Sequence, residues 1–175
     1  MRPTKPYYEN YAKQALTESL LSWMKEKPFE KISVADIAQR GQVSRRAFYL
    51  HYNTKLDILN DYYNVLIREY EANLPGKLAM YSYEETEYFF RFWYRHKDYL
   101  ALLDSQELFY ILLYSFKGYI NRRMSRDTSV EPDDYQFAYS SGGLWALLFK
   151  WTRDEFRETP EHLAKIATSY QEEFL

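Results

Sequence analysis

The 175-residue sequence contains no cysteine, which excludes disulfide bonds, thiolate metal sites and cysteine nucleophiles. It has only 5 glycines and 6 prolines, so few positions interrupt regular secondary structure. It contains no run of about 18 uncharged apolar residues, and we expect no transmembrane helix. The first ten residues lack the apolar segment of a secretory signal, so the expected location is the cytoplasm.

Aromatic residues are abundant instead, with 19 Tyr, 11 Phe and 4 Trp. Apolar side chains recur at helical spacing along nearly the whole chain, and no segment shows the alternation of a strand. The sequence therefore predicts an all-α fold of about nine helices. Helices are expected at residues 8–27, 34–40, 44–52, 54–73, 83–95, from 98, 106–124, 133–153 and from 160, with a loop at 125–134.

Charge is distributed unevenly along the chain, although the net charge is only −2. Residues 1–55 contain ten Lys and Arg against five Asp and Glu, whereas the remainder contains 13 basic and 20 acidic residues. A basic N-terminal segment on an acidic body suggests that a polyanion contacts the N-terminal segment.

Residues 33–52, SVADIAQRGQVSRRAFYLHY, have the size and pattern of a DNA-reading helix-turn-helix. Ser33 and Ser44 are suitable N-caps for the two helices. Gly41 is expected to end the first helix by adopting a left-handed conformation. The pattern therefore predicts two short helices joined by a tight turn.

The second of these helices would present polar side chains on its outer face. In a helix-turn-helix, the N-terminal residues of this helix reach base edges in the major groove. Arginine can form two hydrogen bonds with guanine, while tyrosine hydroxyl and lysine ammonium groups suit phosphates. The residues left for this face are Arg45, Arg46, Tyr49 and His51.

The run IAQRGQVSRRAFYLHYNTKLDIL resembles the signature of the TetR/AcrR family of transcriptional regulators. The matching positions are Ile37-Ala38, Gly41, Val43-Ser44, Phe48-Tyr49, Tyr52 and Lys55. Two positions depart from the family pattern. Arg46 stands where a small residue is common, and Leu56 where an acidic residue is common, so the resemblance does not specify the DNA sequence that is read.

The resemblance implies a DNA-binding head at residues 1–55 and a ligand-binding and dimerisation domain at 56–175. It implies that Tyr49 and Lys55 contact phosphates and that Arg45, Arg46 and His51 lie nearest the bases. We include the cap serines Ser33 and Ser44 in the predicted DNA-binding set. The partners it implies are a double-stranded DNA operator, a second copy of the chain, and a small effector.

The C-terminal domain has more aromatic residues than a small core needs, so part of them is expected to line a cavity for a mostly apolar or aromatic effector. Most aromatics at helical spacing are core residues, and the sequence does not separate the two groups. The segment Ser140–Gly143 places small residues inside an apolar helix, where a helix of a partner subunit could pack closely. The candidate ligand-binding residues are Phe89, Phe92, Trp93, Phe109, Tyr110, Tyr114, Tyr139 and Trp145.

The three histidines, His51, His96 and His162, fall in separate elements without metal-ligand spacing, and no cofactor loop is recognisable. We therefore expect no metal, no cofactor and no catalytic residue. The sequence predicts a DNA-binding transcriptional regulator, by family analogy a repressor, that is switched by a small molecule. The alternative is a helical coregulator that acts through protein–protein contacts and binds no operator.

Overall fold

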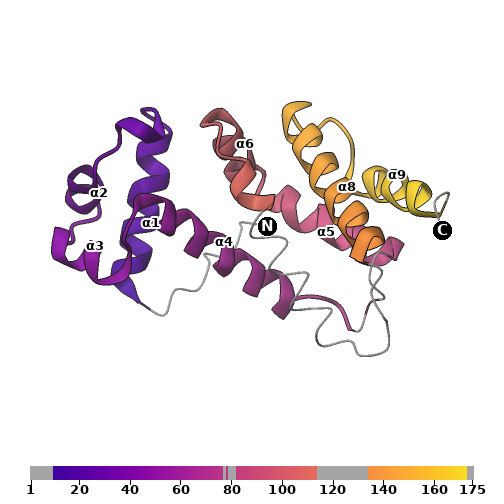
Figure 1. The fold of residues 1–175 in the computed structure, drawn as a ribbon, viewed down its shortest axis with the longest axis horizontal. Helices are drawn as coiled ribbons and strands as arrows, with labels where there is room; N and C mark the ends of the chain where they lie inside the picture. Colours follow the sequence, from indigo (N-terminus) through magenta and orange to yellow (C-terminus); the bar gives the residue numbers. More distant parts are fainter. Residues whose placement is uncertain (1–9, 77, 79–81, 114–133, 173–175) are drawn as a thin grey trace. The chain divides into compact units, whose positions relative to one another are not determined.

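The computed structural model describes residues 10–76, 78, 82–113 and 134–172. The described residues are helical and contain no strand, as predicted (Figure 1). The chain divides into two compact units, residues 2–69 and 70–175, which we call the head and the body. The division falls within α4, whereas the functional boundary predicted at residue 55 lies at the start of that helix and stays a prediction.

The head contains α1 (Tyr11–Met24), the short 3-10 helix η1 (Phe29–Lys31), α2 (Val34–Arg40), α3 (Arg45–His51) and most of α4 (Lys55–Ala72). Asn10 begins α1 by accepting a hydrogen bond from the amide of Ala12, and η1 follows Pro28. Helices α1, α2 and α3 pack against one another around a small apolar core. Its fully buried side chains include Leu16, Leu20, Ile37, Phe48, Ile58 and Leu59.

The turn between α2 and α3 corrects one sequence expectation. Gly41 is not left-handed, since its φ is −75°, and Gln42 takes that conformation with φ 53°. Gly41 is needed for space instead. A Cβ atom there would lie 3.0 Å from the backbone oxygen of Ala15 and 3.2 Å from that of Ile37. The turn is therefore seated directly on the backbone of α1.

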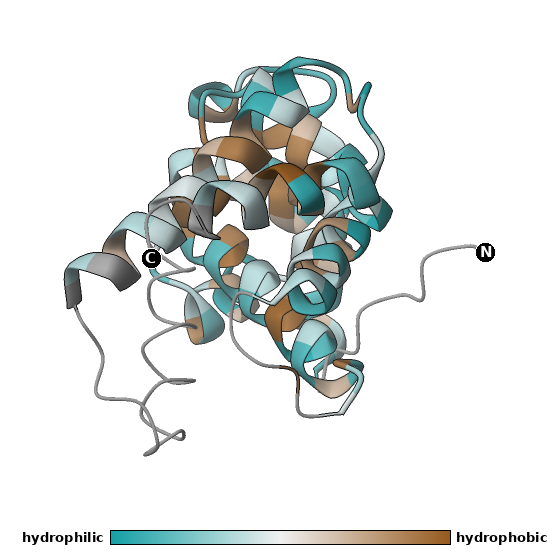
Figure 2. Cartoon of the chain, turned by 90° about the vertical axis from the view of Figure 1, so that its right-hand side faces the viewer, coloured by the Kyte–Doolittle hydropathy of each residue, from teal (hydrophilic) through white to brown (hydrophobic). Residues whose placement is uncertain are grey.

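The body contains α5 (Tyr83–Arg95), α6 (Lys97–Ser105), α8 (Asp134–Arg153) and α9 (Pro160–Glu172). Helix α5 packs chiefly against α9, and α8 packs against both α6 and α9. The helix predicted for 106–124 is seen at residues 110–113, and its remainder and most of the predicted loop lie outside the described residues. Hydrophobic and hydrophilic residues are interspersed along the helices (Figure 2).

Aromatic rings fill the interior of the body. Trp151 lies at the centre of one cluster, 5.7 Å from the ring of Phe90 and 5.1 Å from that of Phe156. Its indole nitrogen donates to the backbone oxygen of Glu158 at 3.0 Å, which joins the end of α8 to the segment before α9. In the described part of the chain, no helix is both long and apolar enough to span a membrane.

Candidate nucleic-acid interface

Both helices of the helix-turn-helix are capped as the sequence predicts. The Ser44 hydroxyl accepts a hydrogen bond from the amide of Ala47 at 3.0 Å and begins α3. Ser33 and Asp36 form a reciprocal capping box at the start of α2, with distances of 3.1 and 2.9 Å. The two serines thus fix the helix ends, and a direct contact between either serine and DNA stays a prediction.

Helix α1 holds α2 through side chains that reach its backbone. The Ser19 hydroxyl donates to the oxygen of Ile37 at 2.8 Å, and the Trp23 indole donates to the oxygen of Asp36 at 3.0 Å. The Lys27 ammonium lies 2.8 Å from the Asp36 carboxylate. Hydrogen bonds from Lys27, and then from Ser33, lower the pKa of Asp36 to about 2. Helix α2 is therefore a fixed support for the turn and for α3.

The basic residue at the end of α2 belongs to this support. The Arg40 guanidinium forms a two-pronged ion pair with Glu26, at 2.7 and 2.9 Å, and donates to the Ser22 hydroxyl at 2.9 Å. It also lies over the ring of Trp23, 3.5 Å from its centroid. The hydrogen bond from Arg40 lowers the pKa of Glu26 and raises that of Arg40. Arg40 therefore fastens α2 to α1 and to the segment that follows α1.

The outer face of α3 is open to solvent. Phe48 is fully buried and anchors the helix, with its ring centroid 5.2 Å from that of Tyr49. Arg45 and Arg46 are exposed, and in the described part of the chain their side chains form no hydrogen bond or ion pair. Tyr49 is 55% exposed. Three of the predicted DNA-binding side chains thus lie on one short, rigid helix and are free to bind.

Two other residues of α3 complete this face. His51 is half-buried, and its ring lies 6.4 Å from that of Tyr52, so it is less accessible than the arginines. Leu50 is 78% exposed, and sequence reasoning missed it because an apolar residue in a helix is ordinarily assigned to the core. An exposed leucine on a DNA-reading helix can contact the methyl group of thymine, as other apolar side chains do.

Lys55 is engaged inside the head. Its ammonium donates to the backbone oxygens of Phe29, of Glu30 at 3.1 Å and of Ile32 at 3.0 Å, and it lies 4.4 Å from the centroid of the Phe29 ring. Burial lowers the pKa of Lys55. All three ammonium protons are therefore used to hold the segment between α1 and α2. The phosphate contact predicted for Lys55 stays a prediction, and it would require the ammonium to release one of these carbonyls.

The end of α3 is tied to α4 and α1 through one carboxylate. The Tyr52 hydroxyl donates to Asp61 at 2.7 Å, and the Lys13 ammonium lies 3.1 Å from the same oxygen. Tyr52 is buried and directly follows α3, while Asp61 belongs to α4. A displacement of α4 would therefore be transmitted to the last turn of α3.

The candidate ligand-binding residues of the body differ in their exposure. Phe89, Phe92, Trp93 and Phe109 are buried, whereas Tyr110 and Tyr139 are about half exposed. Trp145 is half-buried and stacks on Phe149 with ring centroids 5.5 Å apart. Tyr114 lies outside the described residues. The structure does not bring this set together around one described cavity, and only Phe92 lines the groove described next.

A groove of about 500 Å³ lies on the body where the chain leaves α4 and where α5 and α9 meet. Two arginines on α5 border it. Arg91 is paired with Glu87 at 2.6 Å and with Glu161, while the Arg95 guanidinium lies 5.4 Å from the centroid of the Phe92 ring. The groove is lined by Asn73, Tyr88, Arg91, Phe92, Tyr94, Arg95, Pro160 and Glu161. The sequence analysis did not predict the polar residues of this groove, because Tyr88, Arg91 and Arg95 have the pattern of an ordinary solvent-exposed helix face.

The described residues contain no cluster of three or more His, Cys, Asp or Glu side chains that could hold a metal ion.

Comparisons with known proteins agree with the geometry of the head. Residues 17–62 match the family model for bacterial regulatory proteins of the tetR family. No curated protein sequence matches the chain. The solved structure of the fatty acid degradation regulator FadR from Bacillus halodurans has a similar fold, with a TM-score of 0.63 and 13% sequence identity. The similarity covers 94% of this chain and 96% of the FadR chain. Residues 17–62 therefore match the helix-turn-helix segment of the tetR family model, and the chain shares the fold of the FadR structure.

Proposed function

We propose that the protein is a sequence-specific DNA-binding transcriptional regulator that represses its target genes from a palindromic operator. The observation that carries the proposal is the free, exposed face of α3, which presents Arg45, Arg46 and Tyr49 from a helix fixed at both ends. The two arginines read base edges in the major groove, and the Tyr49 hydroxyl binds a backbone phosphate. Such a regulator acts in the cytoplasm, where bacterial DNA is accessible.

The test is a titration of labelled duplexes at several salt concentrations. The probe is the DNA that flanks the protein's own gene, where an inverted repeat would mark the operator, with a scrambled duplex for comparison. Arg45→Ala and Arg46→Ala should each weaken binding to the operator by about 1–3 kcal/mol and relax preference at one base pair per half-site. Tyr49→Phe should weaken both duplexes alike, because it removes only a hydroxyl that contacts the backbone.

The outcome also decides between this function and a helical coregulator. If both arginines can be replaced together with no change in affinity or preference, α3 does not read DNA. The protein would then act through protein–protein contacts of its body.

The active form is proposed to be a homodimer that places two heads on two half-sites. The support is the exposure of side chains on α8, where Tyr135 is 86% and Tyr139 58% exposed. Between these aromatic side chains and the end of the helix, an added Cβ at Gly142 or Gly143 would meet no atom of the described residues within 4 Å. Large apolar side chains beside small residues form a surface that another helix can approach closely. Gly143→Leu should convert the dimer to a monomer in sedimentation analysis, and a wild-type monomer at micromolar concentration would contradict the proposal.

The effector is proposed to occupy the groove between α5 and α9. Its volume of about 500 Å³ suits a drug-sized molecule, and its walls combine the aromatic rings of Tyr88 and Phe92 with the guanidinium of Arg95. These walls favour an apolar or aromatic molecule that carries a negative charge. Asn73, which directly follows α4, forms part of the wall of the groove. A ligand that binds more tightly to one conformation of this segment would increase the fraction of molecules in which the end of α4 has that conformation.

Thermal-shift measurements with aromatic carboxylates test this site. The melting temperature should rise for the wild type and not for Arg95→Gln, while Arg157→Gln serves as a control because Arg157 is exposed and does not line the groove. Equal shifts for all three proteins would place the ligand elsewhere.

A further inference from the structure

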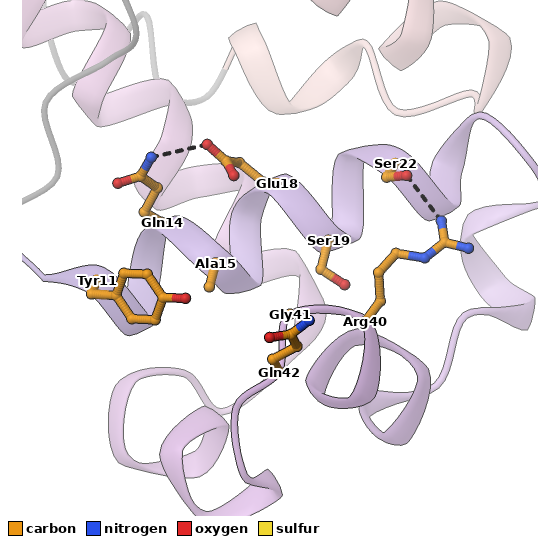
Figure 3. A pocket seen from close by; sticks show the side chains of 9 residues that line it. All are labelled: Tyr11, Gln14, Ala15, Glu18, Ser19, Ser22, Arg40, Gly41 and Gln42. Carbon is orange, nitrogen blue, oxygen red and sulfur yellow. Dashed lines mark hydrogen bonds between the residues drawn. The ribbon is translucent and has the colours of Figure 1, made fainter.

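A polar groove lies between α1 and the turn that joins α2 to α3, the helix proposed above to read DNA and called the recognition helix below. Its volume is about 360 Å³, and its walls come only from the head. Figure 3 shows Tyr11 at one end of the groove and Ser22 with Arg40 at the other, while Gln42 faces α1 from the turn. The lining residues are Tyr11, Gln14, Ala15, Glu18, Ser19, Ser22, Arg40, Gly41 and Gln42.

Most polar groups of this groove already have partners. Arg40 is held by Glu26 and Ser22, and the Ser19 hydroxyl donates to the oxygen of Ile37. The Gln14 amide donates to the Glu18 carboxylate at 2.9 Å. Tyr11 is 75% exposed. In the described part of the chain, the side chains of Tyr11 and Gln42 form no hydrogen bond, so these two donors remain for a ligand.

The backbone at Gln42 is unfavourable for a glutamine. Its φ of 53° lies in the left-handed region, which glycine adopts without steric cost and a residue with a Cβ adopts rarely. Because the amide of Val43 donates to the oxygen of Ala38 at 3.0 Å, the turn keeps this conformation. Backbone strain of this kind is found at functional sites, and the exposed Gln42 side chain is open to a ligand.

The position of this side chain is fixed relative to Tyr11. The contact of Gly41 with the backbone of Ala15 seats the turn on α1, and Tyr11 lies one helical turn before Ala15. Gln42 is three residues before Arg45, the first residue of α3, so chain geometry keeps it within about 10 Å of the recognition helix. Gln42 therefore lies close to the helix that the proposed function assigns to DNA, and Tyr11 lines the same groove as Gln42.

We propose that Gln42 and Tyr11 extend the DNA interface by donating hydrogen bonds to a backbone phosphate next to the bases read by α3. Glutamine and tyrosine side chains are common phosphate donors in protein–DNA complexes. Because these two side chains are neutral, their binding releases no counterions from the DNA. Their contribution to the binding affinity is therefore independent of salt, in contrast to that of lysine or arginine. This inference rests on the proposed DNA-binding function and adds two residues to its contact surface.

The decisive variant is Gln42→Gly, because it affects stability and affinity in opposite directions. Glycine relieves the left-handed strain, so the melting temperature should rise by about 2–5 °C. Loss of the amide should weaken binding to the operator duplex and to a scrambled duplex alike, by about three- to tenfold for each bound head. The slope of affinity against salt should not change. Tyr11→Phe, which removes only the hydroxyl, should weaken both duplexes in the same way.

The matched control is Gln39→Ala, which replaces an exposed glutamine of α2 that does not line the groove and should leave affinity unchanged. The inference is overturned if Gln42→Gly binds both duplexes like the wild type while Arg45→Ala is impaired. It is also overturned if Gln42→Gly loses stability together with affinity, because the turn would then have only a structural role. If the wild-type protein binds neither duplex, the proposed function itself fails.

Discussion

The head and the body are stabilised by different kinds of contact. In the head, short helices are joined by polar side chains that reach specific backbone atoms, such as Trp23 to the oxygen of Asp36 and Lys55 to three carbonyls. In the body, longer helices are joined mainly by aromatic rings, such as those of Phe90, Tyr94 and Trp151. Hydrogen bonds to named atoms fix one geometry, whereas packed rings tolerate alternative arrangements of similar volume. A head that must present side chains to DNA at fixed positions benefits from the first kind of contact.

The largest expected effect comes from removing the one aromatic anchor of the recognition helix. Phe48 is fully buried, and Phe48→Ala should destabilise the head by about 3–5 kcal/mol. Hydrogen exchange read by mass spectrometry should show lost protection in α1, α2 and α3, with the protection of α5 and α9 retained. Leu50→Ala is the control, since a residue that is 78% exposed should change stability by less than about 0.5 kcal/mol.

Equal loss of protection in the head and the body after Phe48→Ala would contradict the view that the two units are stabilised separately. The two units would then unfold as one cooperative structure, despite their different contacts.

The second prediction concerns Lys55, where the sequence and the structure suggest different roles. Lys55→Met keeps the aliphatic chain and removes the ammonium, so the three carbonyls of the 29–32 segment lose their donor. The free energy of unfolding of the head should fall by about 2 kcal/mol, in the range for hydrogen bonds from a charged group. Urea denaturation measures this change. In parallel DNA titrations, a salt slope flattened by about one unit would show that Lys55 also reaches a phosphate.

The third prediction separates the two units by their response to acid. Burial, with a smaller contribution from Arg95, lowers the pKa of His96 in the body from 6.5 to about 4. The unfolded chain therefore binds a proton more readily than the folded body, and stability is lost as the pH falls from 6.5 toward 4. Between about pH 7.5 and about pH 5, the loss should reach about 2 kcal/mol.

In the head, the linkage of Asp36 has the same sign but acts in a lower pH range, because its pKa is lowered from 3.8 to about 2. Its contribution is complete above pH 3.8 and is lost only as the pH falls from there toward 2. Acidification should thus destabilise the body before the head. Urea unfolding at a series of pH values measures this order, and His96→Leu should flatten the change between about pH 7.5 and about pH 5. A wild-type protein equally stable at both values would contradict the prediction.

The same contrast explains how much could be predicted from the sequence. The helix-turn-helix was predictable because its caps, Ser33 and Ser44, and its buried Phe48 are local signals at fixed spacing. The conformation of the turn was predicted incorrectly, because Gly41 is required by a tertiary contact with Ala15 and not by its own φ. The hydrogen bonds of the Lys55 ammonium go to backbone carbonyls more than twenty residues away in the sequence, and no local pattern predicts such contacts.

In the body, helix positions were predictable and the roles of aromatic side chains were not. Phe92 and Phe89 lie on the same helix and have similar surroundings in the sequence, yet only Phe92 lines the groove. Whether a ring faces the core or a groove depends on the arrangement of α5 and α9. That arrangement results from packing between distant segments, which the helical period does not specify.

The smallest expected effect compares a glycine of the head with one of the body. Gly143→Ala adds a Cβ that meets no atom of the described part of the chain within 4 Å. Alanine is more favourable than glycine inside a helix, so the free energy of unfolding should rise by about 0.5–1 kcal/mol. Gly41→Ala should instead lower it by about 1–3 kcal/mol, because the new Cβ would lie 3.0 Å from a backbone oxygen that cannot move freely. Urea denaturation at low protein concentration measures both changes in the monomer.

At high concentration, the gain from Gly143→Ala should shrink if a partner helix packs on α8 at this position. A gain that is independent of concentration would show that Gly143 lies outside the dimer contact. Stabilisation by Gly41→Ala would show that the turn of the head is less tightly seated on α1 than its backbone contacts indicate.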